Sequence, residues 1–135
     1  METIRMIILF LVLVFTQNEL DLLVSIENIN SSEGILKVCL FDSSETFLLK
    51  ALECRDVEPP DSSAVKVIFD VQPGKYYAIS AYHDLNANGR LDRNFLGIPK
   101  EPYGFSNNPS VRFGPPDFSE TAFKIRKGLK ISIRL

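Results

Sequence analysis

Residues 129–135 of the chain read LKISIRL, and apolar and polar side chains alternate at every step of this stretch. A period of two is the pattern of a β-strand that buries one face and exposes the other. The inward face would carry Leu129, Ile131, Ile133 and Leu135, and the outward face Lys130, Ser132 and Arg134. The stretch therefore predicts a closing strand in an all-β domain.

Similar patterns recur along the chain. Residues 20–26 and 65–71 alternate in the same way, and residues 35–41 are apolar on both faces, which is typical of a central strand. Residues 75–82 and 121–126 predict two further strands, the second joined to 129–135 by a tight hairpin at Lys127 and Gly128, whereas residues 43–53 have a short helical pattern. Together they predict an all-β fold, an antiparallel β-sandwich of about six to eight strands with one long ordered loop.

The N-terminus has the pattern of a signal peptide. Arg5 precedes an apolar run over residues 6–15, which is too short to span a bilayer but suits the hydrophobic region of an export signal. Small residues at Val14 and Thr16 place the cleavage before Gln17. We expect a signal peptide at 1–16, a single domain at 17–135, a periplasmic or secreted location and no stable membrane insertion after cleavage. The alternatives are a retained anchor or a buried first strand.

Composition and cysteine count narrow the function classes. The chain has 135 residues, a net charge of −2 and a pI near 5.4, without a basic stripe, which argues against nucleic acid as a partner. In an exported protein, Cys39 and Cys54 predict a disulfide that closes a loop of about 16 residues and adds ~3 kcal/mol. In a reducing compartment the same two residues would be buried free thiols.

A long connection, residues 83–120, separates two predicted strands. Loops of this length are uncommon in compact domains and are usually functional or disordered. This loop is rich in large apolar residues, so disorder is not expected. Those residues are Phe95, Leu96, Ile98, Tyr103, Phe105, Phe113 and Phe118. Something other than strand pairing must keep such a loop folded.

The start of this connection, HDLNANGRLDRN at 83–94, resembles a calcium-binding loop. Asp84, Asn86, Asn88 and Asp92 occupy positions 1, 3, 5 and 9, and Gly89 occupies the turn position 6. The carbonyl of Arg90 would serve at position 7. Position 12 is Phe95 rather than the usual Glu, and Glu101 is the candidate for the missing carboxylate. Alternatively, Asn88-Gly89 is a hairpin turn and no more.

Residues 83–123 read HDLNANGRLDRNFLGIPKEPYGFSNNPSVRFGPPDFSETAF, and a PGKY segment at 73–76 precedes them. This text closely resembles the signature of the domain of unknown function 2141 family of small exported bacterial proteins, HDxNxNGxLDxNxxGxPxEPxGFSNN followed by FGPPxFxxAxF. The resemblance covers nearly all of the chain after the leader. It implies a β-sandwich of the transthyretin or carboxypeptidase-regulatory type, an exported location and the loop as the hallmark. It brings no catalytic residues.

Three functional classes follow from these residues. The leading expectation is a non-enzymatic accessory β-domain that binds calcium as its cofactor and whose loop the ion orders. The alternative is a module that binds a glycan or peptide partner through residues 95–118, with Tyr103, Phe105 and Asn107 as candidate contacts, although core packing is the commoner fate of such rings. A hydrolase that uses His83 as a general base is less expected, because Asp84 cannot both ligate calcium and orient His83.

Overall fold

The structure is a computed structural model and describes residues 18–111 and 113–135. The predicted signal peptide, 1–16, lies outside the described residues. Nine elements follow along the chain: β1 (Leu20–Glu27), β2 (Ile35–Phe41), β3 (Glu53–Val57), β4 (Val65–Val71), β5 (Tyr76–Asp84), β6 (Tyr103–Phe105), α1 (Phe118–Thr121), β7 (Phe123–Lys124) and β8 (Lys130–Arg134). In this part of the chain no helix is long or apolar enough to cross a membrane.

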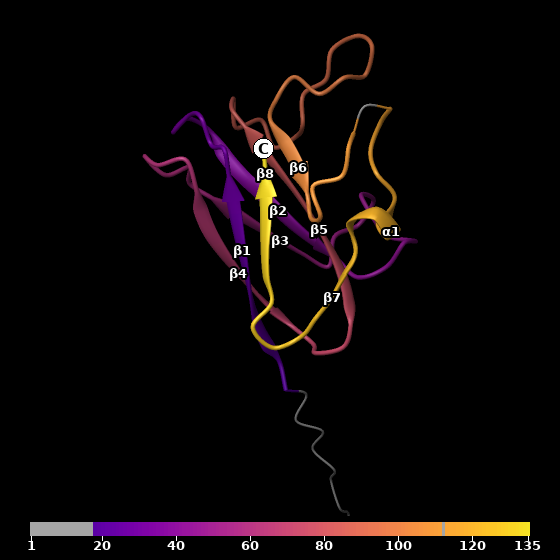
Figure 1. The fold of residues 1–135 in the computed structure, drawn as a ribbon. Coiled ribbons are helices and arrows are strands. Elements are labelled where there is room, and N and C mark those ends of the chain that lie inside the picture. Colours follow the sequence, from indigo (N-terminus) through magenta and orange to yellow (C-terminus); the bar gives the residue numbers. More distant parts are fainter. Residues whose placement is uncertain (1–17, 112) are drawn as a thin grey trace, which may run out of the picture.

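The strands form two packed sheets, which confirms the predicted all-β sandwich (Figure 1). The smaller sheet has the order β4-β1-β8, and the larger has the order β3-β2-β5-β6 with β7 also paired to β5. All pairs are antiparallel except β1 and β8, which run parallel from Leu23↔Lys130 to Glu27↔Arg134. The sandwich is therefore antiparallel apart from this one pair.

The main core fills the space between the sheets. It is made by the alternating residues of β1, β4 and β8 on one side and of β2 and β5 on the other. Phe69 and Val24 are completely buried, as are Val38 and Ile79 on the facing sheet. Both sheets and both hydrophobic clusters described here lie within residues 18–135, so a chain that starts at Gln17 contains all of them.

A second, smaller core covers the outer face of the larger sheet. Phe41 and Ala78 point to this side of β2 and β5, opposite to their neighbours Leu40 and Ile79. Aromatic rings close over them, with Phe47 lying 5.3 Å from Phe41 between ring centroids. The prediction that residues 35–41 form a strand buried on both faces is thus confirmed, because each face has its own core.

Two local predictions were wrong. Residues 44–49 form turns rather than a helix, and Glu53–Val57 is a strand that the sequence pattern did not indicate, because it reads ECRDV with little apolar alternation.

Strands β7 and β8 do not form the predicted hairpin. Strand β7 pairs with β5 and β8 pairs with β1, so the turn at Lys127 and Gly128 carries the chain from one sheet to the other. The two strands share apolar patterning because both border the same core.

Candidate functional site

Strands β5 and β6 hold the base of the predicted calcium loop. Strand β5 ends at Asp84, which is paired with Ile35 of β2, and the chain returns at Tyr103, which is paired with Tyr82. The backbone N–H of His83 also donates to the carbonyl of Pro102 at 2.8 Å. Residues 85–102 therefore leave and re-enter the sheet at adjacent points, and the loop is closed at its base (Figure 1).

Asp84 curls the first half of the loop. Its carboxylate is buried and accepts the backbone N–H of Asn88 at 3.2 Å and that of Gly89 at 2.7 Å. Gly89 has a φ of 84°, a left-handed conformation in which a side chain would be strained. An acidic side chain that binds its own backbone a few residues on is the usual way in which such loops wrap around position 1. The turn predicted at Gly89 is present, and the role of Asp84 as a calcium ligand stays a prediction.

Asp92 receives the two amides predicted to stand beside it. Asn86 Nδ2 donates to its carboxylate at 2.7 Å, and Asn88 Nδ2 donates at 2.8 Å and 3.0 Å. These hydrogen bonds, first from Asn88 and then from Asn86, hold the pKa of the Asp92 carboxyl below its ordinary value of 3.8. The guanidinium of Arg90 lies 3.8 Å away and adds a weaker attraction. The carboxylate is thus held charged by partial positive charges gathered on one side of it.

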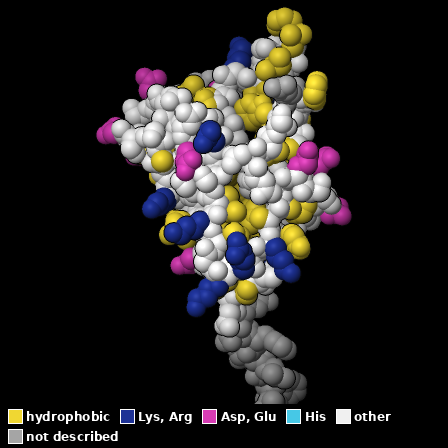
Figure 2. Space-filling model, in the orientation of Figure 1, with side chains coloured by type: hydrophobic (Ala, Val, Ile, Leu, Met, Phe, Trp, Pro, Cys, Tyr) yellow, Lys and Arg dark blue, Asp and Glu magenta, His cyan; other side chains and the backbone are white. Residues whose placement is uncertain are grey.

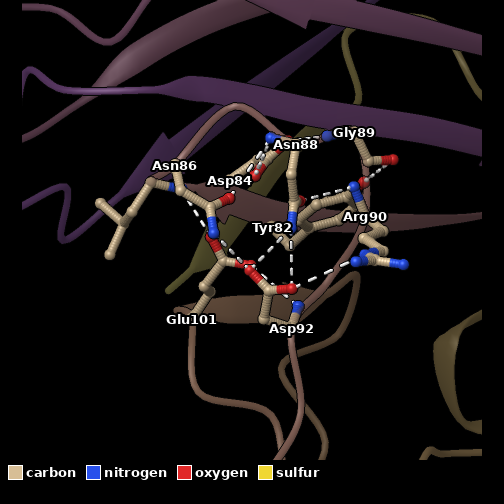
Figure 3. A network of polar contacts seen from close by, with 9 residues as sticks. Tyr82, Asp84, Asn86, Asn88, Gly89, Arg90, Asp92 and Glu101 are labelled. Atoms are coloured by element: carbon tan, nitrogen blue, oxygen red, sulfur yellow. Dashed lines mark hydrogen bonds and ion pairs between the residues drawn. The ribbon is translucent and has the colours of Figure 1, made fainter.

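Glu101 joins the loop from nine residues beyond Asp92, as predicted from the sequence. Its buried carboxylate accepts the backbone N–H of Leu85 at 2.6 Å and that of Asp92 at 2.9 Å. Figure 3 shows Asp92 and Glu101 facing Asp84, Asn86 and Asn88 across the loop. The side chain of Glu101 therefore ties Leu85, at the start of the loop, to Asp92.

The donor set suits a hard cation in chemistry, because all five of these side chains carry oxygen. Within the described residues, no three Asp, Glu, His or Cys side chains lie close enough together to hold a metal by themselves. A calcium site here would depend on the amide oxygens of Asn86 and Asn88, and on a carbonyl such as that of Arg90, as much as on the carboxylates. The side-chain amide nitrogens of Asn86 and Asn88 face the Asp92 carboxylate, so they occupy positions where its negative charge favours positive charge.

Tyr82 lies beside the loop on β5. Its hydroxyl donates to the carbonyl of Gly89 at 3.4 Å, a long hydrogen bond. Burial raises the pKa of Tyr82 above its ordinary value of 10.0, and the negative charges of Asp84, Asp56 and Glu101 raise that pKa further. The carboxylates of Asp84 and Glu101 place negative charge at the base of the loop, and such charge attracts cations.

His83, the candidate general base, is buried at the end of β5. Its Nε2 atom lies 2.6 Å from the carbonyl oxygen of Glu33, in the turn between β1 and β2. The next residue, Gly34, has a φ of 71°, and a Cβ there would lie 2.0 Å from the carbonyl oxygen of Asp84. This close approach of the 28–34 turn to the loop was not predicted. A glycine that follows polar turn residues was the only sequence signal for it.

Two of the three residues predicted as ligand contacts, Tyr103 and Phe105, lie in the second core. Phe105 is buried, with its ring centroid 6.1 Å from that of Tyr103 and 6.4 Å from that of Phe47. Asn107 is exposed, and its amide donates to the carbonyls of Glu120 at 3.2 Å and Ala122 at 3.0 Å, so it fastens the segment around α1. The structure brings Tyr103 and Phe105 together, and it places Asn107 outside the second core. By contrast, Phe95, Leu96 and Ile98 are exposed.

The predicted disulfide is present. Cys39 on β2 and Cys54 on β3 are directly opposite each other in the antiparallel pair and are joined. The bond fastens the charged edge strand β3 to the central strand β2, next to the second core. It supports the sheet rather than the loop.

With the fold and loop described, the chain can be compared with known proteins. The protein is a two-sheet β-sandwich with one long loop whose base is held by polar side chains. Residues 24–132 match the model of the DUF2141 family, described as an uncharacterized protein conserved in bacteria. The chain belongs to this family. Searches of curated proteins and of solved structures gave no match.

Proposed function

We propose that the protein is an exported, non-enzymatic accessory domain whose loop binds calcium through Asp84, Asn86, Asn88, Asp92 and Glu101, with the carbonyl of Arg90. The observation that carries the proposal is the convergence of these side chains on one curled loop, with Asn86 and Asn88 both in contact with Asp92 and with Glu101 tied to the backbone of Asp92. Bare hairpin turns do not require a buried glutamate from outside the turn.

Calcium would replace hydrogen-bond donors that now partly neutralise the three carboxylates. Asp84, Asp92 and Glu101 are satisfied mainly by N–H groups, which carry partial rather than full positive charge. A Ca²⁺ ion would offset two of their three negative charges and fix both halves of the loop at once. With few anionic ligands for a divalent ion and a partly exposed loop, the expected dissociation constant is about 10⁻⁴–10⁻³ M, typical of extracellular modules.

The other parts of the proposal have separate support. The disulfide between Cys39 and Cys54 favours an oxidising compartment, in line with the predicted signal peptide at 1–16 and a periplasmic or secreted location. The burial of His83 against the carbonyl of Glu33 favours a structural role over catalysis. We also propose that the sandwich is of the transthyretin type and that the loop is the hallmark of the family.

The packing of Phe105 and the hydrogen bonds of Asn107 favour a structural role over the alternative of a glycan or peptide platform. Tyr103 is half-buried and in contact with Phe105, so it offers one partly open ring rather than a flat surface of several. The calcium-binding accessory domain is therefore the function that the geometry supports best.

Thermal unfolding of residues 17–135 tests the proposal. At free calcium about ten times the dissociation constant, binding to the folded state adds about 1.4 kcal/mol, and Tm should rise by about 3–8 °C and fall again with chelator. Asp84→Asn and Asp92→Asn should each abolish most of this rise. The matched control is Asp61→Asn in the exposed loop between β3 and β4, which should keep it. An equal calcium effect in all four proteins, or none in the parent chain, would rule out the site.

A further inference from the structure

The loop between β5 and β6 ends in an exposed apolar tip, which we define as residues 95–98. Phe95 is 95% exposed, Leu96 68% and Ile98 56%. Figure 2 shows hydrophobic side chains gathered at the top of the molecule, where this loop projects beyond both sheets in Figure 1. Single exposed apolar residues are common, but three neighbours on one projecting loop indicate a contact surface.

Most backbone polar groups of this tip already have hydrogen-bond partners within the loop. The side-chain oxygen of Asn94 accepts the N–H groups of Leu96 at 2.9 Å and Ile98 at 3.0 Å. The backbone of Asn94 bonds that of Ile98 at 2.9 Å and accepts the N–H of Gly97 at 3.0 Å. The guanidinium of Arg93 donates to the carbonyl of Gly97 at 3.0 Å. Most polar backbone groups of the tip would therefore lose no hydrogen bond on entering an apolar medium, where unsatisfied groups are costly.

The charged side chains nearest the tip in the sequence are cationic. Residues 93–100 contain Arg93 and Lys100, both exposed, and no carboxylate. The carboxylates of the loop lie at its base, where Asp84 and Glu101 are buried and Asp92 accepts the amides of Asn86 and Asn88. Lys and Arg side chains beside an apolar tip are long enough to reach anionic headgroups while the tip lies deeper.

We propose that the apolar tip inserts reversibly into the interfacial region of a bilayer that carries anionic lipids, with Arg93 and Lys100 in contact with the headgroup phosphates. The tip is convex and narrow (Figure 1) and most of its backbone polar groups have partners within the loop, so a deformable apolar layer suits it without a matching groove. The association is peripheral and does not span the bilayer. It goes beyond the proposed calcium function and does not require the ion.

Vesicle co-sedimentation of residues 17–135 in chelator tests this proposal, using phosphatidylcholine vesicles with and without phosphatidylglycerol. The parent chain should bind the mixed vesicles in preference. The double variant Phe95→Ser/Leu96→Ser should bind them ~100-fold more weakly, because each large apolar side chain contributes about tenfold when it is buried. Lys100→Gln should weaken binding by ~5-fold on the mixed vesicles only.

The matched control is Leu49→Ser/Leu52→Ser, which removes two exposed apolar side chains from the turn between β2 and β3. This control should bind within about twofold of the parent. Side chains that stay away from the lipid bury no apolar surface on binding, so their removal should not change the affinity. The Tm of the same variants in chelator shows whether the tip variant is folded, and it does so whether or not the loop binds calcium, which keeps the two proposals separable.

Three results would overturn the membrane proposal. They are equal binding to both vesicle types, unchanged binding by the tip variant, and a concentration-dependent dimer in sedimentation that the tip variant abolishes. The last result would assign the tip to a second copy of the chain instead of a bilayer.

Discussion

The sandwich and the loop of residues 85–102 are stabilised by different forces. Between the sheets, Phe69, Val24 and Ile79 are completely buried, and the core consists of apolar side chains packed against one another. In the loop, the large apolar side chains at the tip face solvent, and the structure depends on the carboxylates of Asp84 and Glu101 accepting backbone N–H groups. One region is built on burial and the other on ionised acceptors.

This difference predicts different sensitivities. Burial of apolar surface responds little to moderate changes in pH or to a dilute cation, because no charge is involved. A loop built on carboxylates responds to anything that changes their charge, including protons and metal ions. We therefore expect two levels of stability, a sandwich that resists such changes and a loop that opens locally when its acceptors are altered.

The largest expected effect lies in the core. Phe69→Ala would remove the largest completely buried side chain, whose ring also lies 5.4 Å from the guanidinium carbon of Arg55. The free energy of unfolding should fall by about 3–5 kcal/mol, the usual cost of such a cavity. Urea denaturation, with and without calcium, measures it. The same loss should appear in both conditions, and a loss that depended on calcium would mean that the two regions are not separate.

An intermediate effect is expected at Glu101. Glu101→Ala leaves the N–H groups of Leu85 and Asp92 without their present acceptor, and the cost should be about 1–3 kcal/mol, confined mainly to the loop. Hydrogen exchange of the loop amides should become faster while exchange in β1 and β4 stays slow. The matched control is Glu45→Ala in the exposed turn after β2. Uniformly faster exchange through the sandwich would contradict the division into two regions.

The parts of the fold that could be predicted from the sequence are those in which apolar side chains are buried. Strands β1, β4 and β8 were predicted from alternation, and β2 from its two apolar faces, because each of these patterns records burial. Strand β3 was missed since ECRDV is a charged edge strand held by pairing and by the disulfide. The partner of β8 was wrongly predicted because alternation specifies which face is buried but not which strand lies beside it.

The loop shows a comparable limit. The spacing of Asp84, Asn86, Asn88 and Asp92 with Gly89 predicted the groups that converge, and Glu101 was predicted from its charge and its place in the chain. Their role in binding calcium stays a prediction. The fates of Phe95 and Phe105 were not separable, because both are aromatic residues of one long loop. In the structure, Phe47 packs against Phe105 on β6, whereas Phe95 lies in the exposed turn that Asn94 holds.

The smallest expected effect is the pH dependence of Asp92 in calcium-free solution. Its folded-state pKa should lie below the ordinary value of 3.8, chiefly because Asn88 and then Asn86 donate to the ionised carboxylate. A lowered pKa means that this carboxylate contributes stability above about pH 3.8, which is lost as pH falls through the lower folded-state pKa.

Titration of the Asp92 carboxyl carbon by NMR measures this pKa directly. Asn88→Ala removes the strongest donor and should raise the pKa of Asp92 toward 3.8, while Asn107→Ala, which removes an amide bound to the segment around α1, should leave it unchanged. A pKa at or above 3.8 in the parent chain would mean that the two amides do not face the carboxylate in solution. In that case the loop would be free to turn its amide oxygens toward an ion, and the electrostatic contrast with the sandwich would arise only once calcium is bound.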